Sequence, residues 1–121
     1  MGMYTELVLK VRVKEDLPAE VEAVFQYLFN REGELPTTIK HPFFECSRHR
    51  HIGSCSSYYH CPFALSRYAE GYIFSRSDLK DYSDEIAKFV DWAKPYFDVM
   101  PGCCFGWSWY EEADQPTLLI A

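Results

Sequence analysis

Polar and apolar residues alternate over residues 5–13, where Leu7, Leu9 and Val11 fall on one side and mostly charged residues on the other. A period of two predicts a strand with one buried face. Over residues 18–29 the apolar residues recur three to four positions apart, which predicts an amphipathic helix. Asp16 is expected to cap this helix, because its carboxylate can accept hydrogen bonds from the free amides of the first turn.

The same changes of period recur later in the chain. A second helix is expected over residues 83–95, with Ser83 as its N-cap and Pro95 ending it early. Further strands are expected at 57–59, 63–68, 72–75, 103–110 and 117–120, with hairpin turns at 69–71 and 111–116. Residues 31–57 fit neither period, and an irregular loop of this length is usually functional.

This order of elements predicts an α+β fold. The expected architecture is an antiparallel sheet of four to five strands with two helices on one face, in a ferredoxin-like (split β-α-β) arrangement plus a C-terminal hairpin strand. A length of 121 residues fits one domain over 1–121. Met1 and Gly2 precede a second Met and are expected to be a cloning remnant.

The net charge and the absence of known catalytic motifs limit the possible classes of function. Acidic and basic residues are equal in number in residues 1–80, so the net charge of −6 lies in residues 81–121. This negative charge favours basic partners and argues against DNA binding. The alternative is that the acidic residues form a solvated face that keeps the protein in solution. The chain has no phosphate-binding loop, dinucleotide fingerprint or nucleophile elbow, so we expect no enzymatic activity. It also has neither an apolar run of about 20 residues nor a secretory signal, so no membrane association and a cytoplasmic location are expected.

Histidine and cysteine cluster between residues 41 and 61. Thiolates and imidazoles are zinc ligands, so a metal site is one interpretation, and the alternative is that the thiols pack as small apolar groups beside solvated imidazoles. A cysteine nucleophile at Cys55 is a more remote alternative. The guanidinium groups of Arg48 and Arg50 could hold an anion. The candidate metal ligands are Cys46, His49, His51, Cys55, His60 and Cys61.

The aromatic strand 103–110 is the candidate partner-binding element. Alternation puts Phe105, Trp107 and Trp109 on one face, with the small residues Gly106 and Ser108 towards the helices. Exposed aromatic residues inside a charged rim are typical of protein interfaces, whereas the alternative is that this row fills the core. The predicted surface comprises Trp107, Trp109, Tyr110, Tyr72 and Phe74, with Glu111, Glu112 and Asp114 as its rim.

Segments 6–13, 52–59 and 71–76 resemble small phage and prophage proteins of unknown function. The resemblance implies a phage accessory protein in the cytoplasm of the host cell. We therefore expect a non-enzymatic protein that binds and inhibits a host protein with a basic surface, such as a defence-system component, with a homodimer as a further candidate assembly. The alternative is a module that binds zinc, a nucleotide or another small ligand through loop 41–61.

Overall fold

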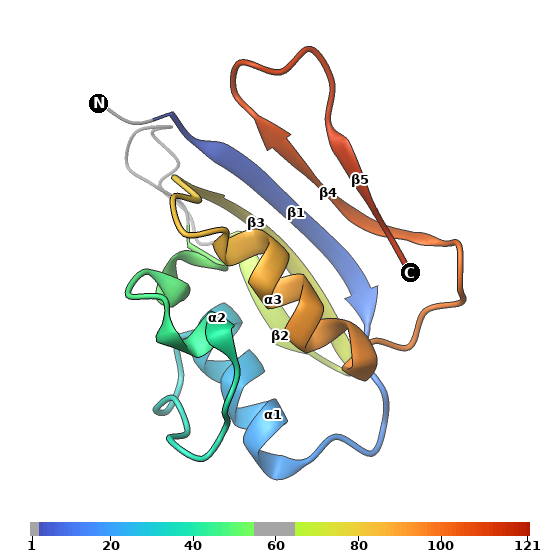
Figure 1. The fold of residues 1–121 in the computed structure, drawn as a ribbon. Coiled ribbons are helices and arrows are strands. Elements are labelled where there is room, and N and C mark those ends of the chain that lie inside the picture. Colours follow the sequence, from blue (N-terminus) through green and yellow to red (C-terminus); the bar gives the residue numbers. More distant parts are fainter. Residues whose placement is uncertain (1–2, 55–64) are drawn as a thin grey trace.

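The computed structural model describes residues 3–54 and 65–121, and these residues form an α+β fold, as predicted (Figure 1). Its five strands form one antiparallel sheet in the order β2-β3-β1-β4-β5. The strands are β1 (Thr5–Arg12), β2 (Ser66–Ala69), β3 (Tyr72–Leu79), β4 (Cys104–Tyr110) and β5 (Thr117–Ile120). The helices are α1 (Ala19–Phe25), the π-helix η1 (Gln26–Asn30), α2 (Pro42–Glu45), α3 (Glu85–Ala93) and the 3-10 helices η2 (His49–His51) and η4 (Lys94–Tyr96).

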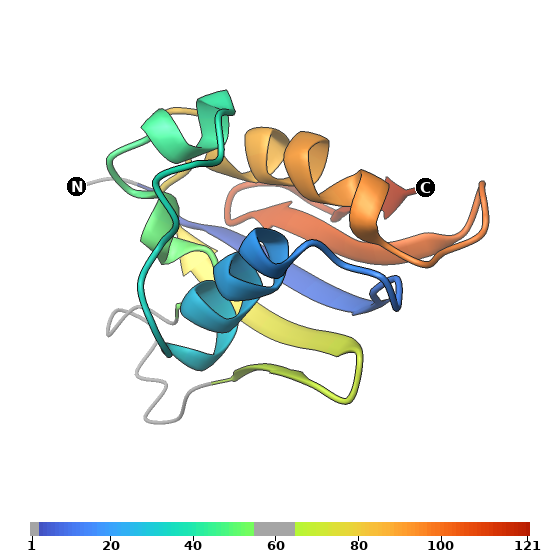
Figure 2. The same ribbon diagram turned by 90° about the horizontal axis from the view of Figure 1, so that it is seen from below.

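The helices cover one face of the sheet only (Figure 2). Strand β1 is central and pairs with β3 on one side and β4 on the other. Helix α1 lies in the connection from β1 to β2, and α3 lies in the connection from β3 to β4. The predicted sheet and its two covering helices are therefore confirmed, while the ferredoxin-like name stays a prediction.

Aromatic rings fill the space between the sheet and the helices. Phe25 of α1 and Phe43 of α2 both contact Trp92 of α3, with ring centroids 5.6 Å and 6.5 Å away. Phe43 also packs 5.3 Å from Phe89, and all four side chains are buried. Burying an aromatic side chain removes a large apolar area from water, so this cluster accounts for much of the aromatic surplus in the sequence.

Both predicted helix caps are wrong. The first helix follows Pro18 and has no side-chain cap, so Asp16 does not fill that role. The second begins at Glu85, and it is Asp81 Oδ1 that accepts a hydrogen bond from Ile86 N at 3.0 Å. The predicted effect of Pro95 is confirmed, because α3 ends at Ala93 and continues only as η4.

The predicted loop 31–57 contains two short helices. His41 begins α2: its Nδ1 accepts from Phe43 N at 3.1 Å, and its Nε2 lies 2.9 Å from Asp91 Oδ2 on α3. This pair of contacts places Phe43 in the core. The strand predicted at 57–59 and the start of the one predicted at 63–68 lie outside the described residues.

Strand β4 carries a register irregularity between Cys104 and Gly106. Phe105 is therefore buried under the helices against Phe97, with ring centroids 5.3 Å apart, and not on the face of Trp107 as predicted. Gly106 does lie on the buried side, but its small size accommodates the neighbouring strand: a Cβ there would lie 2.1 Å from Val8 O.

Gly106→Ala should destabilise the fold strongly, by about 3 kcal/mol, because the new methyl group meets backbone that cannot move away without breaking the β1–β4 pairing. Chemical denaturation measured by circular dichroism would give this value. Ser108→Ala, two residues along the same strand and on the same side, is the control and should change stability little. Equal stability of the two variants would contradict this account of β4.

Asp81→Ala should destabilise by about 1–2 kcal/mol, because Ile86 N loses its acceptor and Asp81 has a φ of 56°, which alanine adopts poorly. Asp81→Asn should cost much less, since the amide oxygen can still accept and asparagine tolerates this backbone conformation.

Burial raises the pKa of Asp81, so the folded state binds its proton more tightly than the unfolded state does. The wild type should therefore gain stability relative to Asp81→Asn as the pH falls towards the ordinary pKa of aspartate. Denaturation at several pH values checks this, and a gain as the pH rises would contradict it.

Candidate functional surface on the open sheet face

Alternation directs every second residue of the strands towards the sheet face opposite the helices. The register places Val8 of β1 between Arg76 of β3 and Trp107 of β4. Two residues further along β1, Lys10 lies opposite Phe74 of β3. We call this surface the open sheet face.

The part over β4 and β5 is apolar. Leu118 pairs directly with Trp107, and Ile120 pairs with Cys104. Leu118 is 57% exposed, Ile120 is 44% exposed and Trp109 is 39% exposed, while Trp107 is half-buried. We call Trp107, Trp109, Leu118 and Ile120 the hairpin patch. The sequence analysis missed its two aliphatic members, although alternation along 117–120 would have placed them on one face.

Both indole groups of the hairpin patch have partners for their N–H. Trp109 Nε1 donates to Ala113 O at 3.0 Å, which anchors the ring on the β4–β5 turn. Trp107 Nε1 donates to Glu6 Oε1 at 3.4 Å. These bonds hold the rings in place, so a partner that packs on them meets side chains that have already lost part of their freedom.

An ionic group lies beside the patch on β1 and β3. Arg76 Nε is 2.8 Å from Glu6 Oε2, and Arg76 Nη1 is 3.8 Å from Asp78 Oδ1. The Asp78 side chain is fully buried. Because Glu6 also accepts from Trp107, this ion-paired group links β3 to β4 across the central strand.

Tyr72 and Phe74 do not join the hairpin patch, contrary to the prediction of one continuous surface. Both are exposed on β3, and β1 separates them from β4. The Arg12 guanidinium lies 5.9 Å from the centroid of the Tyr72 ring, and Lys10 is opposite Phe74. The open sheet face therefore has an apolar half over β4–β5 and a second half in which aromatic and basic side chains alternate.

The remaining residues predicted for this surface lie at its hairpin end. Tyr110 is opposite Thr5, a core-side residue of β1, so alternation directs it to the other face of the sheet; it is exposed there, and its role in partner binding stays a prediction. Glu111 Oε1 accepts a hydrogen bond from Tyr4 N at 3.1 Å. Glu112 and Asp114 are exposed in the turn between β4 and β5, beyond Trp109, where they can form an acidic rim.

The predicted metal ligands are only partly described, since Cys55, His60 and Cys61 lie outside the described residues. Cys46 is buried, with its Sγ 3.6 Å from Pro42 O, and His49 Nδ1 is 2.8 Å from Cys46 O. Within residues 3–54 and 65–121, no three His, Cys, Asp or Glu side chains are grouped so that they could hold a metal ion. The zinc site therefore stays a prediction.

His51, the remaining described candidate ligand, has a pKa below its ordinary value. Burial is the largest cause, followed by the positive charges of Arg50 and Arg48. The sequence analysis had grouped these two arginines as an anion site but had missed Arg31, whose charge also acts on His51.

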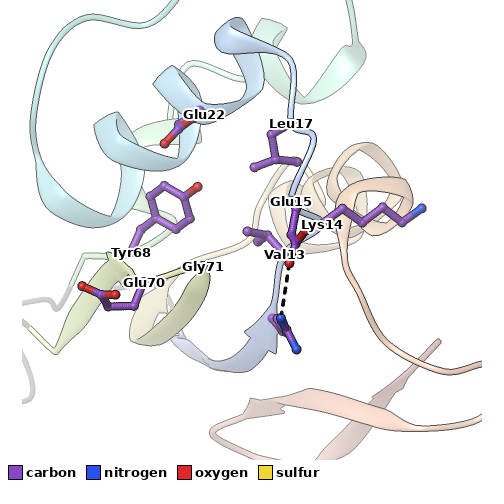
Figure 3. A pocket seen from close by; sticks show the side chains of 9 residues that line it. Val13, Lys14, Glu15, Leu17, Glu22, Tyr68, Glu70 and Gly71 are labelled. Atoms are coloured by element: carbon purple, nitrogen blue, oxygen red, sulfur yellow. Dashed lines mark ion pairs between the residues drawn. The ribbon is translucent and has the colours of Figure 1, made fainter.

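A pocket of about 280 Å³ lies between the β1–α1 connection and the β2–β3 turn (Figure 3). Tyr68 lies between Glu22 and Glu70 in its wall, and burial, with a smaller effect of Glu22, raises the pKa of Tyr68. Arg12 also lines the pocket and forms an ion pair with Glu15 at 3.8 Å. Besides Tyr68, two basic and three acidic side chains line this pocket: Arg12, Lys14, Glu15, Glu22 and Glu70.

No protein-family model, curated protein or solved structure matches this chain. Among the residues that the structure describes, no helix is long and apolar enough to span a membrane.

Fluorescence quenching tests the exposure of the hairpin patch. Trp92 is buried, so the double variant Trp107→Phe/Trp109→Phe should show emission that acrylamide hardly quenches. The matched variant Trp92→Phe keeps both patch indoles and should be quenched readily. Equal quenching of the two proteins would show that the patch is covered in solution.

Proposed function

We propose that this chain is a non-enzymatic protein that binds another protein through the hairpin patch. The observation that supports this proposal is the exposure of three large apolar side chains, Trp109, Leu118 and Ile120, beside the half-buried Trp107 with which Leu118 pairs. Exposed apolar patches on a small domain usually mark an interaction site, since leaving them in water is unfavourable.

The polar surroundings of the patch suit an interface. Tryptophan is among the residues that contribute most to binding energy, and its effect is largest where neighbouring groups exclude water. The half-buried ionic group of Glu6 and Arg76 borders one side, and the acidic turn with Glu112 and Asp114 borders one end. An acidic rim speeds encounter with a basic surface, so we propose a partner that is basic where it meets the turn.

The resemblance to small phage and prophage proteins supports a host protein as this partner. In this proposal the chain acts in the host cytoplasm and inhibits its target by covering the target's surface, as an inhibitor of a defence system would. Such an activity needs no catalytic residues, and the aromatic anchors supply the affinity.

Trp109→Ala should weaken binding of the captured host protein by about 2 kcal/mol, or roughly 30-fold, because it removes an anchor of the patch. The measurement is capture of host proteins on the immobilised chain, followed by titration calorimetry with the isolated partner. Leu118→Ser should also weaken binding of the partner. Tyr82→Ala changes an exposed aromatic residue outside the patch and is the control, with unchanged affinity expected.

Two further measurements separate this proposal from its rivals. The association rate should fall as salt is added, and it should fall less for Glu112→Gln, because that variant removes one charge of the acidic rim. Sedimentation of the chain alone should give a monomer. A dimer that Leu118→Ser dissociates would show that a second copy covers the patch and would contradict the host-partner proposal, as would equal capture by wild type and Trp109→Ala.

A further inference from the structure

Four basic residues cluster on the helix-covered side of the molecule, away from the hairpin patch. Arg48, Arg50 and His51 belong to η2 or precede it, whereas Arg31 follows η1, so two separate segments contribute. The charge of Arg50 acts on both Arg31 and His51, and the charge of Arg48 acts on His51. This concentration of positive charge contrasts with the net charge of −6 of the whole chain.

Close packing of the two segments holds these residues together. Gly53 follows η2 with a φ of +87°, and a Cβ at this position would lie 2.4 Å from Leu28 O and 3.1 Å from Phe29 Cδ1. Ile52 beside it is fully buried. Only glycine therefore allows the turn to lie directly against the last residues of η1, which Arg31 follows.

Hydrogen bonds fix the Arg31 side chain relative to η2. Its guanidinium donates to Ser54 Oγ, which in turn donates to Arg50 O at 3.2 Å. Ser54 N also donates to His51 O at 3.0 Å. On the other side, Asn30 makes two hydrogen bonds to the backbone of Tyr68 on β2, which anchors the end of η1 to the sheet. Hydrogen bonds to η2 and to β2 therefore fix the position of Arg31 before any ligand binds.

The charges of this cluster are poorly compensated. Within the part of the chain that the structure describes, no carboxylate forms an ion pair with Arg31, Arg48 or Arg50. Burial lowers the pKa of Arg31, Tyr27 raises it in part, and the charge of Arg50 lowers it by a smaller amount. Like charges held close together destabilise the charged state, and an anion between them would remove that cost.

We propose that Arg31 and Arg50, with His51 beside them, bind a phosphate group. Guanidinium groups form paired hydrogen bonds with phosphate oxygens, and two of them match the double negative charge of a phosphate monoester or of free phosphate. The Arg48 guanidinium packs over the Tyr82 ring, 5.5 Å from the ring centroid. Arg48 therefore acts on the phosphate through its charge at longer range. The site would bind a small phosphorylated ligand independently of the hairpin patch.

Calorimetric titration with inorganic phosphate and with adenosine monophosphate at low salt tests the proposal. We expect saturable binding to one site, and at least roughly tenfold weaker binding for Arg50→Gln and for Arg31→Gln, because each removes a charge-assisted contact. Arg67→Gln removes an exposed arginine on β2 and is the control for net charge, with unchanged affinity expected. Tighter binding of the nucleotide would identify a phosphate ester as the ligand, and tighter binding of inorganic phosphate would identify free phosphate.

A second measurement separates binding from folding defects. Ser54→Ala keeps every charge but removes the hydroxyl that positions Arg31, so it should weaken phosphate binding several-fold while the circular dichroism spectrum stays unchanged. Thermal unfolding of the wild type should shift upward with phosphate, and that of Arg50→Gln should not. The proposal is overturned if phosphate binding does not saturate, or if Arg67→Gln weakens it as much as Arg50→Gln does.

Discussion

The aromatic cluster around Trp92 is the interaction on which the rest of the structure depends. It joins α1, α2 and α3 through Phe25, Phe43 and Phe89. These helices all lie on one face of the sheet (Figure 2). A sheet of five strands has two faces, and a chain of this length uses its helices to cover one of them. The open sheet face is therefore a direct consequence of where the aromatic core forms.

This one-sided packing separates two candidate sites. The hairpin patch lies on the open sheet face, where alternation directs Trp107 and Leu118 outward. The basic cluster lies on the other side, where Phe43 and Ile52 anchor a loop that would otherwise lack a core. In the described part of that loop, Leu35, Ile39 and Phe44 also pack against the core.

Polar groups on the open sheet face keep it from being a uniform apolar surface. Arg76 binds Glu6 and lies near Asp78, while Glu6 also accepts from Trp107. This group divides the apolar half over β4–β5 from the half with Tyr72 and Phe74. A partner that recognises the hairpin patch would meet a fixed charged border on one side and the acidic turn on another, and such borders favour one orientation of binding over others.

The amino-acid sequence by itself determined the fold class, because periods of two and near 3.6 identify strands and helices locally. Alternation also put Trp107 and Trp109 on one face, but it did not decide whether that face is covered or open. Only the tertiary structure decided what depends on contacts between distant segments: the irregularity that buries Phe105, the capping of α3 by Asp81 and the hydrogen bond from Arg31 to Ser54 beside η2. A pattern read along the chain reports which residues share a face, but it carries no information on which distant segment will pack there, and that packing places both candidate sites.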